Sequence, residues 1–156
     1  DHPLCKELNI SLERLVQEPF ILREVGSGSR DATMKVFSSR GLVPNVRMEL
    51  GSNEAIKHAV VGGLGLTVLS LHTVTLEGAN GPVAMLDVEG FPIERKWYVV
   101  HAKDKELSLI AKTFLEFALA SEPVINERMK TLYAGFSARQ KATRKMSESK
   151  LDNAAE

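Results

Sequence analysis

The sequence predicts an α/β fold with a mainly parallel sheet, and two observations support this prediction. Between residues 11 and 70, helix patterns and strand patterns alternate along the chain, which is typical of strands joined by crossover helices. The stretch 64–70 is mostly apolar, as expected for a parallel strand that is buried on both faces.

The first elements follow from caps and apolar spacing. Residues 10–17 indicate a short helix that Ser11 caps, and residues 19–24 indicate a strand. A helix is expected over 29–41, where Gly41 is suited to the position just beyond the last turn.

The next elements repeat this order. Residues 44–50 alternate between apolar and polar side chains, which predicts a half-buried strand. A helix over 52–63 and a strand over 64–70 follow.

The second half contains a turn at 78–82, strand patterns at 83–88 and 95–102, and a helix at 107–120 with Ser108 as a possible cap. The apolar stripe of that helix comprises Leu107, Ile110, Ala111, Phe114, Phe117 and Ala118. From 121 to 156 we expect a polar tail with at most one short helix.

Composition excludes several classes of function. The 20 basic and 20 acidic residues balance, which argues against a nucleic-acid-binding domain. Cys5 is the single cysteine, so an intrachain disulfide is impossible and a cytoplasmic location is expected. The sequence contains no run of 18 apolar residues, so no membrane span is predicted. The chain begins at Asp1 without a methionine, which we interpret as a cut inside a longer protein.

The loop around Ser27, Gly28, Ser29 and Arg30 joins a predicted strand to a predicted helix. Backbone N–H groups and the positive end of a helix dipole attract anions there, and a serine or arginine side chain adds donors. The loop lacks the lysine of a P-loop and the glycine spacing of a dinucleotide-binding fold. It therefore indicates either a phosphate or carboxylate site or an ordinary capped helix.

A second strand-to-helix junction has the same character, with Ser52 and Asn53 at its turn and Glu54 beginning the helix. Two such junctions on one cleft would bind a polar ligand, and two ordinary capped helices remain the alternative. A carboxylate repels a phosphate, so Glu54 is better suited to the helix dipole.

No catalytic arrangement is visible in the sequence. The four histidines are scattered without metal-ligand spacing, and Ser27 has no histidine and acid arranged around it. The sequence therefore predicts neither an enzyme, nor a metal site, nor a bound cofactor.

Three linked segments resemble a known family: "EPFILREVGSGSR", "GLVPNVRMELGSNEAIKHAVVGGLGLTVLS" and "LDVEGFPIERKWYVVHAKDKELSLIAKTFLEFAL". Together they resemble the effector-binding region of LysR-type transcriptional regulators over about residues 1–120. The third segment resembles the CbbR and CmpR branch, which controls carbon-fixation genes.

The resemblance implies a fold like that of periplasmic binding proteins, in which two α/β subdomains joined by crossing strands enclose a small effector. Residues 1–65 would form most of the second subdomain, and 66–120 the returning half of an incomplete first subdomain. It also implies a homodimer or tetramer through the first subdomain, and DNA contact only through an N-terminal helix-turn-helix that this chain lacks.

The resemblance further implies which residues bind the effector, and that the ligand is a signal. They are Ser27, Gly28, Ser29, Arg30, Ser52, Asn53, Glu54 and Thr67. Effectors implied for this branch are ribulose bisphosphate, phosphoglycolate and NADPH. The alternatives are a solute-binding module of the same fold and an α/β enzyme that acts on a phosphorylated substrate.

Overall fold

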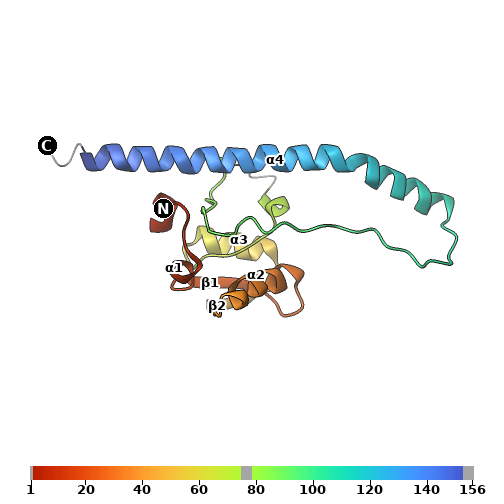
Figure 1. Ribbon diagram of the computed structural model, residues 1–156, viewed down its shortest axis with the longest axis horizontal. Helices are drawn as coiled ribbons and strands as arrows, with labels where there is room; N and C mark the ends of the chain where they lie inside the picture. The colour runs from red at the N-terminus through yellow and green to blue at the C-terminus, as the bar shows by residue number, and fades with distance from the viewer. Residues whose placement is uncertain (1, 75–78, 153–156) are drawn as a thin grey trace.

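A computed structural model describes residues 2–74 and 79–152 (Figure 1). The elements, in chain order, are η1 (Pro3–Lys6), α1 (Leu12–Leu15), β1 (Pro19–Arg23), α2 (Gly28–Ser39), β2 (Asn45–Leu50), α3 (Asn53–Val61), η2 (Leu71–Val74) and α4 (Leu109–Asp152). The predicted order from 11 to 61 is confirmed. Gly78 of the predicted turn and residues 153–156 of the predicted tail lie outside the described residues.

The described sheet contains two parallel strands. β1 pairs with β2 from Pro19 opposite Asn45 to Arg23 opposite Leu50, with an irregularity after Phe20. The prediction of a strand over 64–70 is wrong, because these residues do not form a regular strand. Only Leu66 bridges to β1, through bonds of 2.8 Å to the backbone of Pro19 and Ile21. The residues after it leave the sheet and line a cleft, so their apolar character reflects burial without strand pairing.

The helix ends follow the capping residues in the sequence. Ser11 Oγ accepts the Arg14 N–H at 3.2 Å, and Ser52 Oγ accepts the Ala55 N–H at 3.5 Å. At the end of α2, Gly41 has φ +67°. The Leu42 N–H donates to the Phe37 carbonyl at 3.0 Å, which closes the last turn as a Schellman motif.

The core lies on both faces of β1. Phe20 and Leu22 share a cluster with Phe37 of α2, and the rings of Phe20 and Phe37 meet edge to face with centroids 5.4 Å apart. Ile21 alternates with them along the strand and is buried outside that cluster, as is Ile56 of α3. The sheet is thus covered by helices on each side, which fixes its carboxyl edge between α2 and α3.

Two strands predicted in the second half are wrong. In 83–88 only Val88 bridges, to Ile10, and residues 95–102 form no strand. Trp97 is 86 % exposed and Val100 is 85 % exposed. A strand requires a neighbour for its backbone groups, and the described part of the chain places none beside 95–102.

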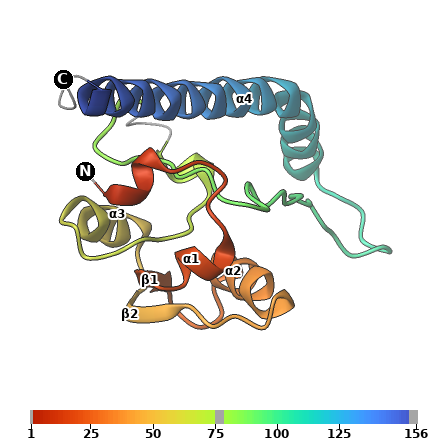
Figure 2. The ribbon, with the colours of Figure 1, turned by 60° about the vertical axis from the view of Figure 1, so that its left-hand side comes forward.

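Helix α4 begins as expected but ends much later. The Ser108 carbonyl accepts the Lys112 N–H at 2.9 Å and its hydroxyl accepts the Ala111 N–H at 3.3 Å. The expected end near residue 120 is wrong, because the helix continues through Pro123 to Asp152. It bends between its teal and blue parts (Figures 1 and 2), and a proline inside a helix is a common cause of such a bend.

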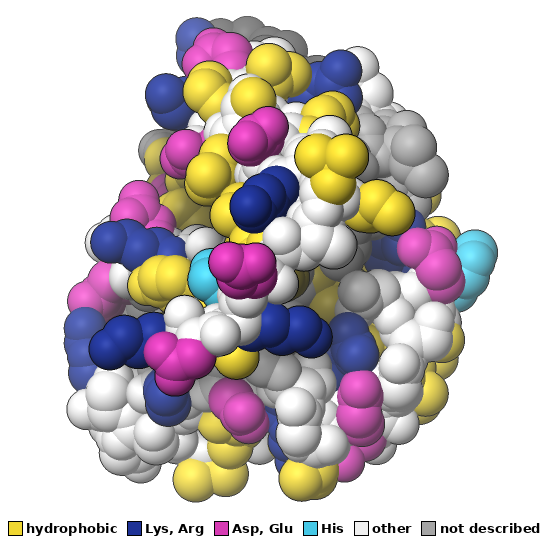
Figure 3. Space-filling model, turned by 90° about the vertical axis from the view of Figure 1, so that its right-hand side faces the viewer, with side chains coloured by type: hydrophobic (Ala, Val, Ile, Leu, Met, Phe, Trp, Pro, Cys, Tyr) yellow, Lys and Arg dark blue, Asp and Glu magenta, His cyan; other side chains and the backbone are white. Residues whose placement is uncertain are grey.

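The predicted apolar stripe of α4 is not buried. Ile110 is 83 % exposed and Phe117 is 68 % exposed, since no described element packs against them. Hydrophobic side chains accordingly gather on the upper part of the molecule in Figure 3, where α4 lies. Within residues 2–74 and 79–152, no helix combines the length and apolar character that crossing a bilayer demands.

The later part of α4 packs across the rest of the molecule. Phe136 is buried, and Arg139 Nη1 donates to the carbonyl oxygens of Ala79 at 2.9 Å and Gly81 at 2.7 Å. A side chain at Gly135 would lie 2.9 Å from Ala79 Cβ. Residues predicted as a polar tail are therefore a docked helix.

Candidate functional site

The carboxyl edge of the sheet brings two helix N-termini together. β1 and β2 are parallel and end opposite each other at Arg23 and Leu50. The chain turns after each strand and enters α2 and α3, respectively. Ligands of open α/β sheets bind at this edge, so the two junctions selected from sequence lie beside each other in space.

A cleft of about 1460 Å³ opens at this edge. Five of the eight predicted site residues line it: Ser27, Gly28, Ser29, Asn53 and Thr67. This volume is larger than that of a pocket that encloses a small ligand. The cleft is therefore open in this conformation. The opposite wall comes from α4, where Lys130, Tyr133 and Phe136 face the same space.

The N-terminus of α2 is open, whereas that of α3 is capped. The Ser27 hydroxyl makes no capping bond, and the N–H groups of Gly28 and Ser29 find no acceptor among the described residues. Ser52, in contrast, caps α3 with its own side chain. The free donors and the helix dipole make α2 the better of the two anion sites.

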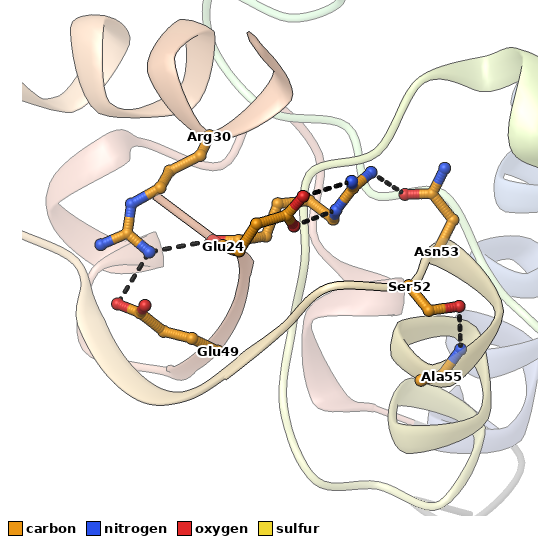
Figure 4. A network of polar contacts seen from close by, with 7 residues as sticks. Glu24, Arg30, Glu49, Ser52, Asn53 and Ala55 are labelled. Carbon is orange, nitrogen blue, oxygen red and sulfur yellow. Dashed lines mark hydrogen bonds and ion pairs between the residues drawn. The ribbon is translucent and has the colours of Figure 1, made fainter. Parts of the chain in front are cut away.

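Arg30 is directed away from the cleft. Its Nη1 lies 2.7 Å from Glu49 Oε1 of β2 and donates to the Arg23 carbonyl at 2.9 Å (Figure 4). Ser52 and Glu54 do not line the cleft either, and Glu54 pairs with Lys57 Nζ at 2.8 Å. The assignment of these three to effector binding stays a prediction that the geometry does not favour.

A polar network joins the two junctions. Arg23 donates to both Glu24 carboxylate oxygens, at 2.7 and 2.9 Å, and to Asn53 Oδ1 at 2.6 Å (Figure 4). The side-chain hydrogen bonds from Arg23 lower the pKa of Glu24 below its ordinary value, and Glu24 in turn raises the pKa of Arg23. Because Asn53 accepts from Arg23, its amide N–H₂ group is left to donate into the cleft.

Thr67 is the one buried polar side chain without a partner among the described residues: its Oγ1 is out of contact with solvent and makes no hydrogen bond. Thr67 lines the cleft. A buried hydroxyl without a partner costs free energy, and a ligand would supply the missing bond if closure of the cleft brought one of its atoms against this oxygen.

Sequence reasoning missed the charged residues of the cleft, which are the basic Arg23, Lys57, Arg95, Lys96 and Lys130 and the acidic Asp87 and Glu94. Lys57 could have been found, because it follows Glu54 by three positions on a helix at the site. Arg95 and Lys130 come from segments far along the chain, and no local pattern connects them to the glycine-serine loop.

The chemistry of the cleft is that of anion binding. Backbone N–H groups, hydroxyls, amides and arginine and lysine side chains line it, and these basic side chains outnumber the two carboxylates, Asp87 and Glu94. In the described residues, no group of three or more histidine, cysteine, aspartate or glutamate side chains could hold a metal ion. These features define a class: an α/β module that binds a small polar ligand at the carboxyl edge of its sheet.

Comparison with known proteins identifies the module. A family model of the LysR substrate binding domain matches residues 1–122, and the chain belongs to this family. It is 55 % identical over 125 residues to the transcriptional activator CmpR of Synechocystis, and 52 % identical over 121 residues to the RuBisCO operon transcriptional regulator of Acidithiobacillus ferrooxidans.

These matches cover 80 % and 78 % of this chain, but 41 % and 39 % of the two relatives. The chain thus spans about two-fifths of the length of the regulators it matches. The resemblance to LysR-type regulators of the carbon-fixation branch is confirmed.

Solved structures confirm the fold class. The regulatory domain of Synechocystis CcmR, in complex with 2-PG, superposes with a TM-score of 0.72 at 48 % identity, covering 77 % of this chain and 58 % of that one. The effector-binding domain of QuiR, in complex with shikimate, gives a TM-score of 0.64 at 22 % identity, covering 77 % and 56 %. That second likeness shows the fold alone.

Proposed function

We propose that this chain senses a small phosphorylated metabolite for a transcriptional regulator of carbon-fixation genes. The observation that carries the proposal is the open N-terminus of α2 beside the unpartnered hydroxyl of Thr67, both in one cleft. These groups are donors for an anion with several oxygens.

The relatives supply the biological context. Their names describe regulators of the RuBisCO operon, and the CcmR domain was solved with 2-PG. A phosphoglycolate molecule carries a phosphate and a carboxylate, which suits a cleft with both helix N–H groups and side-chain donors. Ribulose bisphosphate and NADPH are the other two candidates for this chain.

The mechanism is a shift between closure states. An effector that contacts both the α2 side and the α4 side favours the conformation in which they approach. A differential affinity of a few kcal/mol is enough to reverse such an equilibrium. We propose that the change reaches DNA through a helix-turn-helix, which the name of the CmpR relative includes, and through an oligomer.

Ligand binding can be tested by thermal unfolding with 2-phosphoglycolate, ribulose bisphosphate or NADPH, with sulfate and unphosphorylated glycolate as controls. A ligand at a hundred times its Kd adds about 2.7 kcal/mol to the free energy of unfolding. We expect one phosphorylated metabolite to raise the melting temperature, and sulfate and glycolate to leave it nearly unchanged.

Two hydroxyl variants refine this test. Thr67→Val removes the unpartnered hydroxyl and should weaken binding of the responding metabolite about tenfold or more, because one hydrogen bond to a charged ligand is lost. Ser38→Ala, at the exposed far end of α2, is the matched control. Equal shifts with all anions, or none with any metabolite, would contradict the proposal.

A solute-binding module and an enzyme are the remaining alternatives. The regulator relatives disfavour the first. For the second, incubation of each metabolite with the chain should leave it chemically unchanged, as ³¹P NMR would show.

A further inference from the structure

Arg95 lies against the first residue of α2. If Gly28 carried a Cβ, Nη2 of Arg95 would be 3.0 Å from it, Nη1 3.4 Å and Cζ 3.6 Å. The guanidinium therefore covers the backbone at the point where α2 begins. Arg95 belongs to the extended segment that was expected to be a strand, so the contact joins distant parts of the chain.

The charge of Arg95 is unpaired among the described residues. Its acidic neighbours, Glu94 in sequence and Asp31 in the first turn of α2, make no ion pair with it. The other arginine of the cleft, Arg23, is held by Glu24. Arg30, next to the cleft, is held by Glu49. Arg95 is thus the arginine available to a ligand.

The groups beside Arg95 are also unoccupied. Ser27 makes no capping bond, and the first N–H groups of α2 have no acceptor among the described residues. A guanidinium offers parallel N–H donors that match two oxygens of a phosphate. A helix N-terminus offers backbone N–H groups to the remaining oxygens.

We propose that Arg95 is a specificity-determining residue of the cleft, which binds the phosphate group of the effector together with the first turn of α2. This inference rests on the proposed function and deepens it, since it says which groups select a phosphorylated ligand. Gly28 is part of the same arrangement, because the absence of a side chain there lets the guanidinium lie close to the backbone.

The test is calorimetric titration of 2-phosphoglycolate, and of inorganic phosphate, into the unmodified chain and the variants Arg95→Gln and Arg95→Lys. Arg95→Gln should lower the affinity for 2-phosphoglycolate at least tenfold, which is the loss expected for a charge-assisted pair of hydrogen bonds. Arg95→Lys keeps the positive charge but loses the two parallel N–H donors of the guanidinium. Its affinity for 2-phosphoglycolate should lie between those of the unmodified chain and Arg95→Gln. The difference in affinity between Arg95→Gln and the unmodified chain should become smaller at high salt, because salt screens the charge of Arg95.

Arg128→Gln is the matched control. Arg128 is exposed on α4 and does not line the cleft, so its variant should bind like the unmodified chain. Arg95 is exposed as well, and we expect melting curves without ligand to be unchanged for both.

Gly28→Ala tests the same arrangement from the other side. The added methyl group displaces only the end of a flexible side chain, and alanine favours a helix over glycine. Stability should therefore be kept while affinity for 2-phosphoglycolate falls several-fold.

The outcomes separate the two proposals. If the unmodified chain binds none of the phosphorylated metabolites, the proposed function fails and the role of Arg95 with it. If the unmodified chain binds and Arg95→Gln binds equally well, only the role of Arg95 is overturned.

Discussion

Gly65 lies directly against the backbone of β1. A Cβ at this position would lie 2.5 Å from the Pro19 carbonyl oxygen and 3.1 Å from its carbon. The neighbouring Leu66 N–H donates to that same oxygen at 2.8 Å. One residue further lies Thr67, which lines the cleft. A residue without a side chain thus connects the sheet to the ligand site.

Gly65→Ala should destabilise the protein by about 1–3 kcal/mol, the usual cost of forcing extra volume into a packed position. The clash is with backbone, so relief requires the Leu66 segment to move from β1. Urea unfolding measures the change.

Gly51→Ala is the control for this substitution, because a Cβ at Gly51 meets nothing within 4 Å. Its free energy of unfolding should stay within about 0.5 kcal/mol of the unmodified value. Equal stability of the two variants would mean that the Leu66 segment is not fixed to β1.

At the residue scale, the sequence predicted what local chemistry determines. Ser11, Gly41 and Ser52 act at the helix ends as expected, and Ser27 to Ser29 line the cleft. Arg30 could not be placed, because its direction depends on Glu49 of the neighbouring strand. A charged side chain close to a site in sequence can still pair on the other side of the backbone.

At the element scale, periodicity identified helices well and strands less well. A helix satisfies its own backbone, so α2 and α3 follow from their own residues. A strand depends on a neighbour, and the pattern at 95–102 contains no information about whether one is present. The end of α4 was missed for a different reason, since the polar stretch after residue 120 was interpreted as a tail, and the structure continues the bent helix through Pro123.

Arg139→Ala should loosen the docked part of α4. Arg139 Nη1 donates to two carbonyls of the 79–81 loop, and hydrogen bonds from a charged donor contribute roughly 1.5–3 kcal/mol. Hydrogen exchange should become faster in peptides covering 79–83 and 132–140.

Lys141→Ala is the matched control on the same helix, since Lys141 is exposed and makes no ion pair with the described residues. Its exchange pattern should match that of the unmodified chain. If Arg139→Ala leaves exchange unchanged too, the arginine does not hold α4 in place.

At the scale of the whole molecule, burial is uneven. The fully buried hydrophobic side chains lie between Leu4 and Ile56, with Val88 and Phe136 added from later segments. The segment from Trp97 to Ile125 contributes none, and its large apolar side chains, such as Trp97 and Phe117, are exposed. The α/β class was predictable because it depends on the first of these regions.

Amide exchange should reveal this unevenness directly. Backbone amides in β1 and α3 should open only with global unfolding, whereas those in 97–108 have few hydrogen-bond partners and should exchange almost as fast as in an unfolded chain. The first turns of α4 should be intermediate, because an unpacked helix is marginally stable. Strong protection across 97–108 would contradict the arrangement described.

Strand β2 has one further consequence, which concerns how molecules behave toward each other at high concentration. β2 pairs with β1 on one side, and no described strand lies on its other side. An open edge of this kind can recruit the same strand from another molecule into a continuous intermolecular sheet. Here Pro44 precedes the strand, and Arg47 and Glu49 are exposed along it. Charged side chains along an edge strand disfavour the addition of another strand, so we expect β2 to resist this route to aggregation.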